Sequence, residues 1–293
     1  MTGPLPRPPV ALSIAGSDPS GGAGIQADLK AFSALGAYGT CVVTALTAQS
    51  TRGVTHVHEV PVDVVRAQVE TLVADVRVDV VKVGMLASVE LVETVDELLR
   101  QGPLAEVPVV LDPVMVATSG SRLLAEDAVT AVRSLVTRAD VVTPNLPEAA
   151  VLLDEEPVGT VAGMSEQAER LLALGARRVL LKGGHLGGDA AVDVWSDGAG
   201  DPVLLHAQRV RTSSTHGTGC TLSSAIAALR PQHDGWLPAV REAKSWLTQA
   251  LRHADVLDVG AGAGPVHHFH ELERWRTSSS AGRAPGPRVF TAR

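Results

Sequence analysis

Aromatic residues are scarce in this sequence: Phe, Trp and Tyr together make up 3% of its 293 residues. A core without them has to be built from Ala, Val and Leu, and few aromatic faces remain for stacking the bases of single-stranded nucleic acid. An excess of positive charge is also missing, because the formal net charge is −7 at pH 7. A general surface for nucleic acid or another polyanion is therefore not expected.

Cysteine and long apolar segments are also rare. With only two cysteines, Cys41 and Cys220, a scaffold held by several disulfides is excluded. Prolines interrupt the first ten residues, which argues against a signal peptide. No uninterrupted run of about 18 apolar residues occurs, so no membrane span is expected. We therefore expect a cytoplasmic protein. Hydrophobic residues still amount to 45% of the chain, which is enough for a folded core.

Short, Val-rich runs alternate with amphipathic stretches along most of the chain. Continuous apolar runs are typical of strands covered on both faces, and amphipathic stretches between them are typical of crossover helices. The expected strands are 10–15, 41–48, 80–83, 107–111, 141–143 and 179–181. The expected helices are 25–35, with Gly36 as its cap, and 62–76, 88–99, 126–137 and 165–174. This order predicts an α/β fold with a mostly parallel sheet flanked by helices.

The pattern changes after Lys182, where short runs separated by Gly and Asp indicate antiparallel strands. These expected strands are 191–195, 203–206 and 209–211, and the helices that follow are 219–229 and 237–256. No internal repeat or Gly/Ser linker divides the chain. We therefore expect one domain over 10–276, a flexible extension over 1–9 and a disordered tail over 277–293.

A Gly-rich segment, Ala11 to Lys30, contains the first expected strand and the loop after it. Residues 22–27 fit the loose dinucleotide pattern GxGxxG/A. The loop is long for such a turn, however, and the next strand ends without an acidic residue for a ribose. Two other interpretations stay open. The segment is either a purely structural turn or a loop shaped around a small ligand, with Asp28 available to hydrogen-bond it.

A second Gly-rich segment, Ser214 to Leu229, places Gly217 and Gly219 on either side of Thr218 at the start of a helix. Backbone N–H groups at a helix N-terminus form an anion hole, and glycines let a phosphate approach closely. Cys220 would lie in this first turn, where the helix dipole is expected to lower the pKa of its thiol. The alternative is a Gly-rich connection with a buried, inert cysteine. The sequence has no GxxxxGK[ST] motif, so the loop is not of the Walker type.

Asn145 and Glu148 lie in the segment Thr143–Leu153, which follows an apolar run and begins a helix. Their spacing lets both side chains face one point above the strand end, and an Asn/Glu pair suits Mg²⁺ held largely through water. The same spacing also fits a capping box, with Asn145 at the N-cap and Glu148 at N3. Both interpretations can be true together.

The chain uses lysine only four times, against 21 arginines, so its lysines are expected to mark places that need a flexible point charge. Lys182 ends an apolar run, where α/β sheets bind ligands. Lys30 and Lys82 are expected to be solvated on the surface. The three histidines of 267–270 lack HxxxH spacing and a cysteine partner, so a metal centre is not expected there. Packing roles are expected for Trp236, Trp246 and Trp275.

Eight segments of the chain carry a specific resemblance to a known family. They are 15–39, 44–51, 82–86, 111–115, 143–149, 181–185, 215–229 and 264–270. In this order they resemble the ribokinase-like small-molecule kinases, and among these the bacterial hydroxymethylpyrimidine/phosphomethylpyrimidine kinases of thiamine biosynthesis. The resemblance implies a ribokinase-like fold, ATP and Mg²⁺, a homodimer, and two successive phosphorylations. The hydroxyl of 4-amino-5-hydroxymethyl-2-methylpyrimidine is phosphorylated first, and its monophosphate then becomes the diphosphate.

The resemblance also implies roles for individual residues. It implies a pyrimidine pocket lined by Gly16, Ala23, Asp28, Gln49, Met85 and Val114. It implies phosphate and nucleotide contacts from Lys182, Thr218 and Lys244, and a Mg²⁺ held, through water, by Asn145 and Glu148. The implied anion hole is formed by Gly217 and Gly219. Cys220 takes the place that an aspartate base fills in most sugar kinases of the superfamily.

Three other functions are to be weighed against this one. The cysteine of the GTGC loop favours the pyrimidine kinases, but a pyridoxal or pyridoxine kinase of the same fold is the alternative, because both substrates are small hydroxymethyl heteroaromatics. A non-enzymatic pyrimidine-binding protein would bind its ligand without consuming ATP. A dinucleotide-dependent oxidoreductase would bind NAD, for which the ribose carboxylate is missing.

Overall fold

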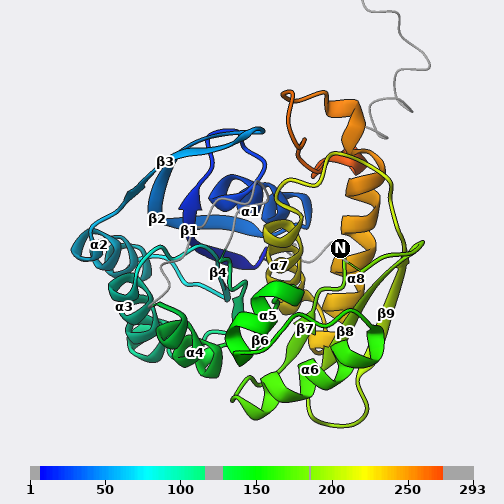
Figure 1. Ribbon diagram of the computed structural model, residues 1–293. Coiled ribbons are helices and arrows are strands. Elements are labelled where there is room, and N and C mark those ends of the chain that lie inside the picture. The colour runs from blue at the N-terminus through cyan, green and yellow to red at the C-terminus, as the bar shows by residue number, and fades with distance from the viewer. Residues whose placement is uncertain (1–6, 116–127, 185, 273–293) are drawn as a thin grey trace, which may run out of the picture.

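A nine-stranded sheet forms the centre of the computed structural model, which describes residues 7–115, 128–184 and 186–272 (Figure 1). The strand order is β3-β2-β1-β4-β5-β6-β7-β8-β9. The strands are β1 (Val10–Ser17), β2 (Tyr38–Ser50), β3 (Gly53–Glu59), β4 (Val80–Val83), β5 (Val109–Leu111), β6 (Val141–Val142), β7 (Val179–Leu181), β8 (Ala190–Ser196) and β9 (Val203–Gln208). The strands from β2 to β7 in this order pair in parallel, whereas β3, β8 and β9 pair antiparallel, so the predicted mostly parallel α/β fold is confirmed.

Helices cover both faces of the sheet, and each face has its own apolar core. One face is covered by α2 (Val62–Val73), α3 (Val89–Arg100), α4 (Val129–Arg138), α5 (Leu146–Leu153) and α6 (Val161–Ala173). The other face is covered by α1 (Gly24–Ala34), α7 (Thr218–Leu229) and α8 (Trp236–Arg252). Short 3₁₀ turns are η1 (Gly102–Leu104), η3 (Arg230–Gln232) and η4 (Ala254–Leu257). Neighbouring strand residues such as Val80 and Val81 belong to opposite cores, which is why these strands have continuous apolar sequences.

The structure differs from the sequence-based expectations at a few elements. Strand β3 was not predicted, because it is an edge strand with mostly exposed side chains. The strand expected over 209–211 is wrong, since β9 ends at Gln208 and the guanidinium of Arg209 instead donates to the carbonyl oxygens of Gly184 and Gly188, at 2.6 and 2.8 Å. Helix α6 begins four residues earlier than expected, because Thr160 caps it by accepting a hydrogen bond from Gly163.

The ends of the chain were expected to be flexible or disordered. Part of the N-terminal extension is instead tied to the fold: Arg7 forms an ion pair with Asp79 at 2.9 Å, and Pro9 accepts a backbone hydrogen bond from Tyr38. Residues 1–6, 126–127 and the expected tail 277–293 lie outside the described residues. Within the described ranges, no helix combines the length and the apolar character needed to cross a membrane.

The strand order places a topological switch point beside β1. The chain passes from β1 to β2 on one side and then crosses to β4 on the other. In open α/β sheets, ligands bind at such a point, outside the carboxyl ends of the strands. The loops that follow β1, β4, β5, β6 and β7 are therefore the place to look for a functional site.

Candidate active site

A cavity of about 730 Å³ lies at this edge of the sheet. Its walls include the ends of β1, β2 and β4 to β7, the first turn of α7 and one face of α8. Of the residues singled out from the sequence, it brings together Gly16, Ala23, Gln49, Met85, Val114, Asn145, Glu148, Lys182, Gly217, Thr218, Gly219, Cys220 and Lys244. Of all the predicted site residues, only Asp28 does not line the cavity.

Asp28 is fully buried and does not line the cavity. Its carboxylate accepts hydrogen bonds from the hydroxyls of Ser13 and Ser224, both at 2.6 Å, and from Lys82 Nζ at 2.9 Å. Because these groups use its acceptors, Asp28 does not have the ligand-contacting position expected for it. The expectation of a surface Lys82 is also wrong, since this side chain is 0% exposed and forms an ion pair with Asp28. Lys30, which is only half-buried, donates to the carbonyl oxygen of Gly21 at 2.7 Å.

The first turn of α7 opens onto the cavity and has the features of an anion hole. Its N-cap residue, Gly217, has φ +71°, and no side chain caps the helix. A Cβ at this position would lie 1.8 Å from the carbonyl oxygen of Gly22, so the turn requires glycine. The N–H groups of a first helical turn have no intrahelical acceptor. Those of Gly219 and Cys220 are therefore available to a phosphate in the cavity.

Cys220 does not have the lowered pKa that its helical position predicted. Burial raises the pKa of its thiol to about 11, although Lys82 and the N–H of Gly24 act in the opposite direction. Nearby carboxylates of Asp28 and Asp112 raise it further. The helix dipole is thus outweighed by the loss of water around the sulfur. In the ligand-free site, Cys220 is a thiol at neutral pH.

Asn145 and Glu148 form the capping box at the start of α5. Asn145 Oδ1 accepts from the N–H of Glu148 at 2.9 Å, and Glu148 Oε2 accepts from the N–H of Asn145 at 2.8 Å. The capping interpretation is therefore confirmed. Both side chains also line the cavity, as the metal interpretation requires. Burial raises the pKa of Glu148 to about 7, although Lys182 opposes the shift.

Lys182 and Asp112 form the charged centre of the cavity. Lys182 Nζ donates to Asp112 Oδ1 at 2.7 Å and lies 3.8 Å from Glu148 Oε2. Burial lowers the pKa of Lys182, but the two carboxylates more than offset this, so that the amine stays charged. Asp112 was not singled out from the sequence, although it directly follows β5. The described residues hold no group of three or more potential His, Cys, Asp or Glu metal ligands. The carboxylates of Asp112 and Glu148 fit a Mg²⁺ whose remaining ligands are phosphate and water.

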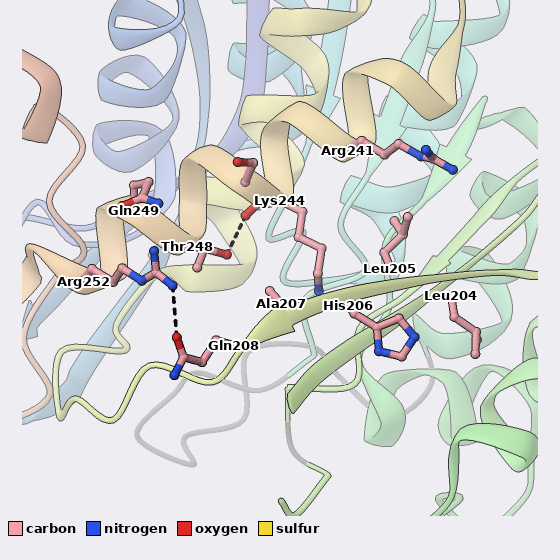
Figure 2. A pocket seen from close by; sticks show the side chains of 11 residues that line it. Leu204, Leu205, His206, Ala207, Gln208, Arg241, Lys244, Thr248, Gln249 and Arg252 are labelled. Atoms are coloured by element: carbon pink, nitrogen blue, oxygen red, sulfur yellow. Dashed lines mark hydrogen bonds between the residues drawn. The ribbon is translucent and has the colours of Figure 1, made fainter. Parts of the chain in front are cut away.

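The far end of the cavity lies between β9 and α8. Leu247 and Leu251 contribute apolar side chains there. Lys244, expected to contact the nucleotide, lines this end, but its Nζ donates to Asp193 Oδ2 at 2.5 Å. A more open cavity of about 470 Å³ adjoins it and shares Lys244 and Thr248 (Figure 2).

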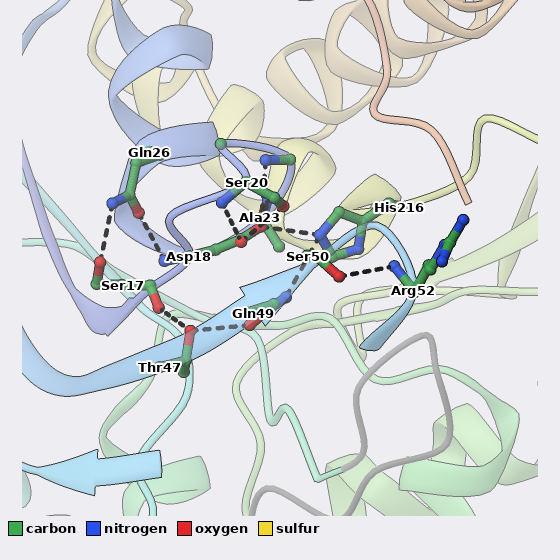
Figure 3. A network of polar contacts seen from close by, with 12 residues as sticks. Ser17, Asp18, Ser20, Ala23, Gln26, Thr47, Gln49, Ser50, Arg52 and His216 are labelled. Atoms are coloured by element: carbon green, nitrogen blue, oxygen red, sulfur yellow. Dashed lines mark hydrogen bonds and ion pairs between the residues drawn. The ribbon is translucent and has the colours of Figure 1, made fainter. Parts of the chain in front are cut away.

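Asp18 and His216 meet at the opposite end, beside Gln49 (Figure 3). All three line the cavity, and the sequence singled out only Gln49. The pairing of Asp18 with His216 was not expected, because neither residue belongs to a short motif that requires the other.

The histidines of 267–270 lie away from this site and are buried. His268 Nε2 is 3.0 Å from the hydroxyl of Thr221, and burial lowers its pKa to about 3. The ring of Trp246 packs against His268 and His270. Trp236 and Trp246 are buried in the core, as expected, whereas Trp275 lies outside the described residues.

Known proteins are similar to this chain in both sequence and fold. The Phosphomethylpyrimidine kinase family matches residues 18–267. A hydroxymethylpyrimidine/phosphomethylpyrimidine kinase of Escherichia coli is 54% identical over 261 residues, which are 89% of this chain and 97% of that protein. The phosphomethylpyrimidine kinase of Clostridium difficile has a TM-score of 0.72 and 38% identity, covering 83% of this chain and 99% of that one.

A pyridoxal kinase of Staphylococcus aureus, solved with AMP-PCP and pyridoxal, is also similar. It has a TM-score of 0.82 and 32% identity, over 91% of this chain and 95% of that one. Its fold agrees well, but its sequence is less similar than that of the Escherichia coli enzyme. Family and cavity together exclude the dinucleotide oxidoreductase and the non-enzymatic binding protein. The chain belongs to the phosphomethylpyrimidine kinase family and is a ribokinase-like kinase.

Proposed function

We propose that this kinase transfers the γ-phosphoryl group of ATP to 4-amino-5-hydroxymethyl-2-methylpyrimidine and then to the resulting monophosphate, in thiamine biosynthesis. The observation that carries the proposal is that one cavity joins a small pocket beside Gln49 to the anion hole of α7. The pocket has apolar walls that include Met85 and Val114, which suit a flat heteroaromatic ring.

The proposed reaction consists of two phosphoryl transfers to different acceptors. In the first step the alcohol oxygen bonds to the γ-phosphorus, the bond to the β,γ-bridging oxygen breaks, and ADP leaves. The proton of the alcohol must pass to a base, for which we propose Cys220. In the second step the acceptor is a phosphate oxygen, already ionised at neutral pH. Lys182 and the N–H groups of the anion hole would stabilise the charge that develops on the transferred group.

The direct test is to incubate the purified protein with ATP, Mg²⁺ and hydroxymethylpyrimidine and to follow the products by mass spectrometry. The expected result is the monophosphate first and the diphosphate later, with one ADP released for each phosphate transferred. A protein that releases ADP only with pyridoxine would contradict the proposal and favour the pyridoxal kinase alternative. The Staphylococcus aureus enzyme of similar fold was solved with pyridoxal, which supports a slower side activity of this kinase on hydroxymethyl pyridines.

Gln49→Ala is expected to weaken binding of the pyrimidine while leaving ATP binding nearly unchanged. Gln49 lines the ring end of the cavity, and an unpaired pyrimidine edge should cost about 1–3 kcal/mol of binding free energy. Isothermal titration with each ligand separately measures both effects. Equal losses for the pyrimidine and for ATP would show instead that Gln49 has a structural role.

Glu148→Gln is expected to reduce activity sharply, with partial recovery at high Mg²⁺ concentration. The amide keeps the size of the side chain and can still accept the capping hydrogen bond from Asn145, but it removes the charge that we propose organises Mg²⁺ and its waters. The melting temperature should stay close to that of the wild type.

Thr160→Ala provides the matched control, since it removes the side-chain cap of α6, at a helix end outside the cavity. It should lower the melting temperature slightly and leave activity unchanged. If Glu148→Gln behaves like this control, the metal role proposed for Glu148 is wrong and capping is its whole function.

The resemblance to the family also supports a homodimer and a cytoplasmic location, which we add to the proposal.

A further inference from the structure

The loop between β1 and α1 is organised around the carboxylate of Asp18 (Figure 3). Asp18 Oδ1 accepts from the N–H and the hydroxyl of Ser20, at 2.9 and 2.7 Å. Asp18 Oδ2 accepts from the N–H groups of Gly22 and Ala23, at 3.1 and 2.8 Å, and lies 2.8 Å from His216 Nε2. A buried carboxylate that is surrounded by donors on both oxygens is held in its ionised form.

The partners of Asp18 determine where the proton of His216 lies. An ionised carboxylate can only accept hydrogen bonds, so Nε2 of His216 must carry a proton and donate it to Asp18. The hydrogen bonds from His216, Ser20 and Ala23 outweigh burial and lower the pKa of Asp18, which keeps the carboxylate ionised at neutral pH. Because this proton is donated to Asp18, His216 Nε2 has no lone pair with which to accept a hydrogen bond from the Gln49 amide.

Gln49 lies between this N–H group and a hydroxyl. Its side-chain amide has one end 3.4 Å from His216 Nε2 and the other 3.1 Å from the hydroxyl of Thr47. That hydroxyl donates its proton to the carbonyl oxygen of Ser17 at 2.8 Å, which leaves a lone pair for the amide. In the structure the Gln49 Nε2 faces the protonated Nε2 of His216, which places two donors against each other. A 180° rotation of the amide removes this conflict: the amide oxygen then shares the Nε2 proton with Asp18, and the NH₂ group donates to Thr47.

We propose that Asp18 and His216 are positioning residues that set the orientation of the Gln49 amide, and thereby select an aminopyrimidine as substrate. The inference rests on the proposed function. With the amide held in this orientation, one N–H and one lone pair of Gln49 remain for the ligand. They match a ring nitrogen and the amino group beside it. A pyridine ring without the amino group can satisfy only half of this pair, and an unsatisfied polar group in a buried site discriminates strongly.

The backbone around His216 packs closely against its ring, which supports a fixed position for the imidazole. A Cβ at Gly22 would lie 2.3 Å from the ring of His216, so the loop that carries Asp18 packs directly on the imidazole. His216 precedes Gly217, the N-cap of α7. The group that orients Gln49 is therefore fixed to the anion hole, and the ring and the phosphate are positioned by one connected unit.

The test is the ratio of kcat/KM for hydroxymethylpyrimidine to kcat/KM for pyridoxine. His216→Ala should raise the KM for hydroxymethylpyrimidine roughly tenfold, the loss expected when one buried hydrogen bond is left unmade. The KM for ATP and kcat should change little, and the ratio should fall by the same factor. His216→Gln should restore most of the ratio, because its amide nitrogen can reach both Asp18 and Gln49. Thr160→Ala, which removes a helix cap outside the cavity, is the control and should leave the ratio unchanged.

An unchanged ratio in His216→Ala, or an equal rise in the KM for ATP, would overturn the proposal. So would a His216→Gln variant that discriminates no better than His216→Ala. If His216→Ala does not fold, His216→Asn takes its place, since its shorter amide cannot bridge Asp18 and Gln49 and should show the same loss. Failure of the wild type to phosphorylate hydroxymethylpyrimidine would contradict the proposed function itself, before any variant is compared.

Discussion

Replacement of Cys220 by alanine is expected to slow formation of the monophosphate roughly 10²–10⁴-fold and to slow formation of the diphosphate much less. The alcohol of the first step has a proton to lose, whereas the phosphate monoester of the second step is already ionised. Cys220 lies in the first turn of α7 and lines the cavity, where a base would have to be. Supplying each acceptor separately and timing the release of ADP measures the two steps independently.

The raised pKa of Cys220 adds a pH dependence to this expectation. Because burial raises the pKa of the thiol to about 11, only a small fraction of the site holds a thiolate at pH 7. A base acts in its deprotonated form, so the first step should accelerate roughly tenfold for each pH unit between about 7 and 9. Cys220→Ala should abolish this acceleration. Cys41→Ala, at a cysteine outside the cavity, is the matched control and should preserve it.

Two outcomes would contradict a base at this position. Equal slowing of both steps in Cys220→Ala would mean that the side chain shapes the anion hole. If neither step is slowed, the alternative interpretation of the sequence holds, and Cys220 is a buried, inert cysteine.

Lys82→Met is expected to lower the free energy of unfolding by about 3–5 kcal/mol. The substitution leaves Asp28 fully buried without its cation, and the remaining partners, the hydroxyls of Ser13 and Ser224, cannot neutralise its charge. Urea denaturation followed by circular dichroism measures the loss. A buried charge without a partner is among the most destabilising changes that a single substitution can cause.

The double variant Asp28→Asn with Lys82→Met separates loss of the pair from loss of packing. It removes both charges, and the asparagine can still bond to the two serines, so most of the stability should return. Arg66→Met breaks the exposed ion pair with Glu97 and should cost no more than about 1 kcal/mol. A double variant as unstable as Lys82→Met alone would show that the loss comes from packing of the lysine stem.

The central fold was predictable because the strands are buried on both faces. Val80–Val83 and Val179–Leu181 were assigned correctly to the residue, since apolar runs of this kind allow few alternatives. Strand β3 was not predicted, because its side chains are largely exposed and their hydrophobic pattern does not distinguish a strand from a loop. Arg209 was mistaken for part of a strand, because a run of apolar and arginine residues does not reveal that the guanidinium binds backbone carbonyls.

The site was only partly predictable for a related reason. Turns such as that at Gly217 have local signatures, and the structure places them at the cavity. The pair of Asp18 and His216 joins residues 198 positions apart, and Lys82 meets Asp28 across 54 positions. Nothing local in the sequence reports such partners. The pKa of Cys220 was predicted in the wrong direction, since the helix dipole can be inferred from the sequence whereas the depth of burial cannot.

The distribution of the four lysines has a practical consequence for chemical labelling. Lys82, Lys182 and Lys244 line the cavity, and Lys30 holds the loop next to Asp18. All of the lysine amines of this chain therefore lie in or beside the site, and each has an acceptor or an acidic partner. An amine-acylating reagent should consequently modify the side chains slowly. Any change in their acylation rate when ATP or an acceptor is added would report on ligand occupancy, without a background from lysines elsewhere on the surface.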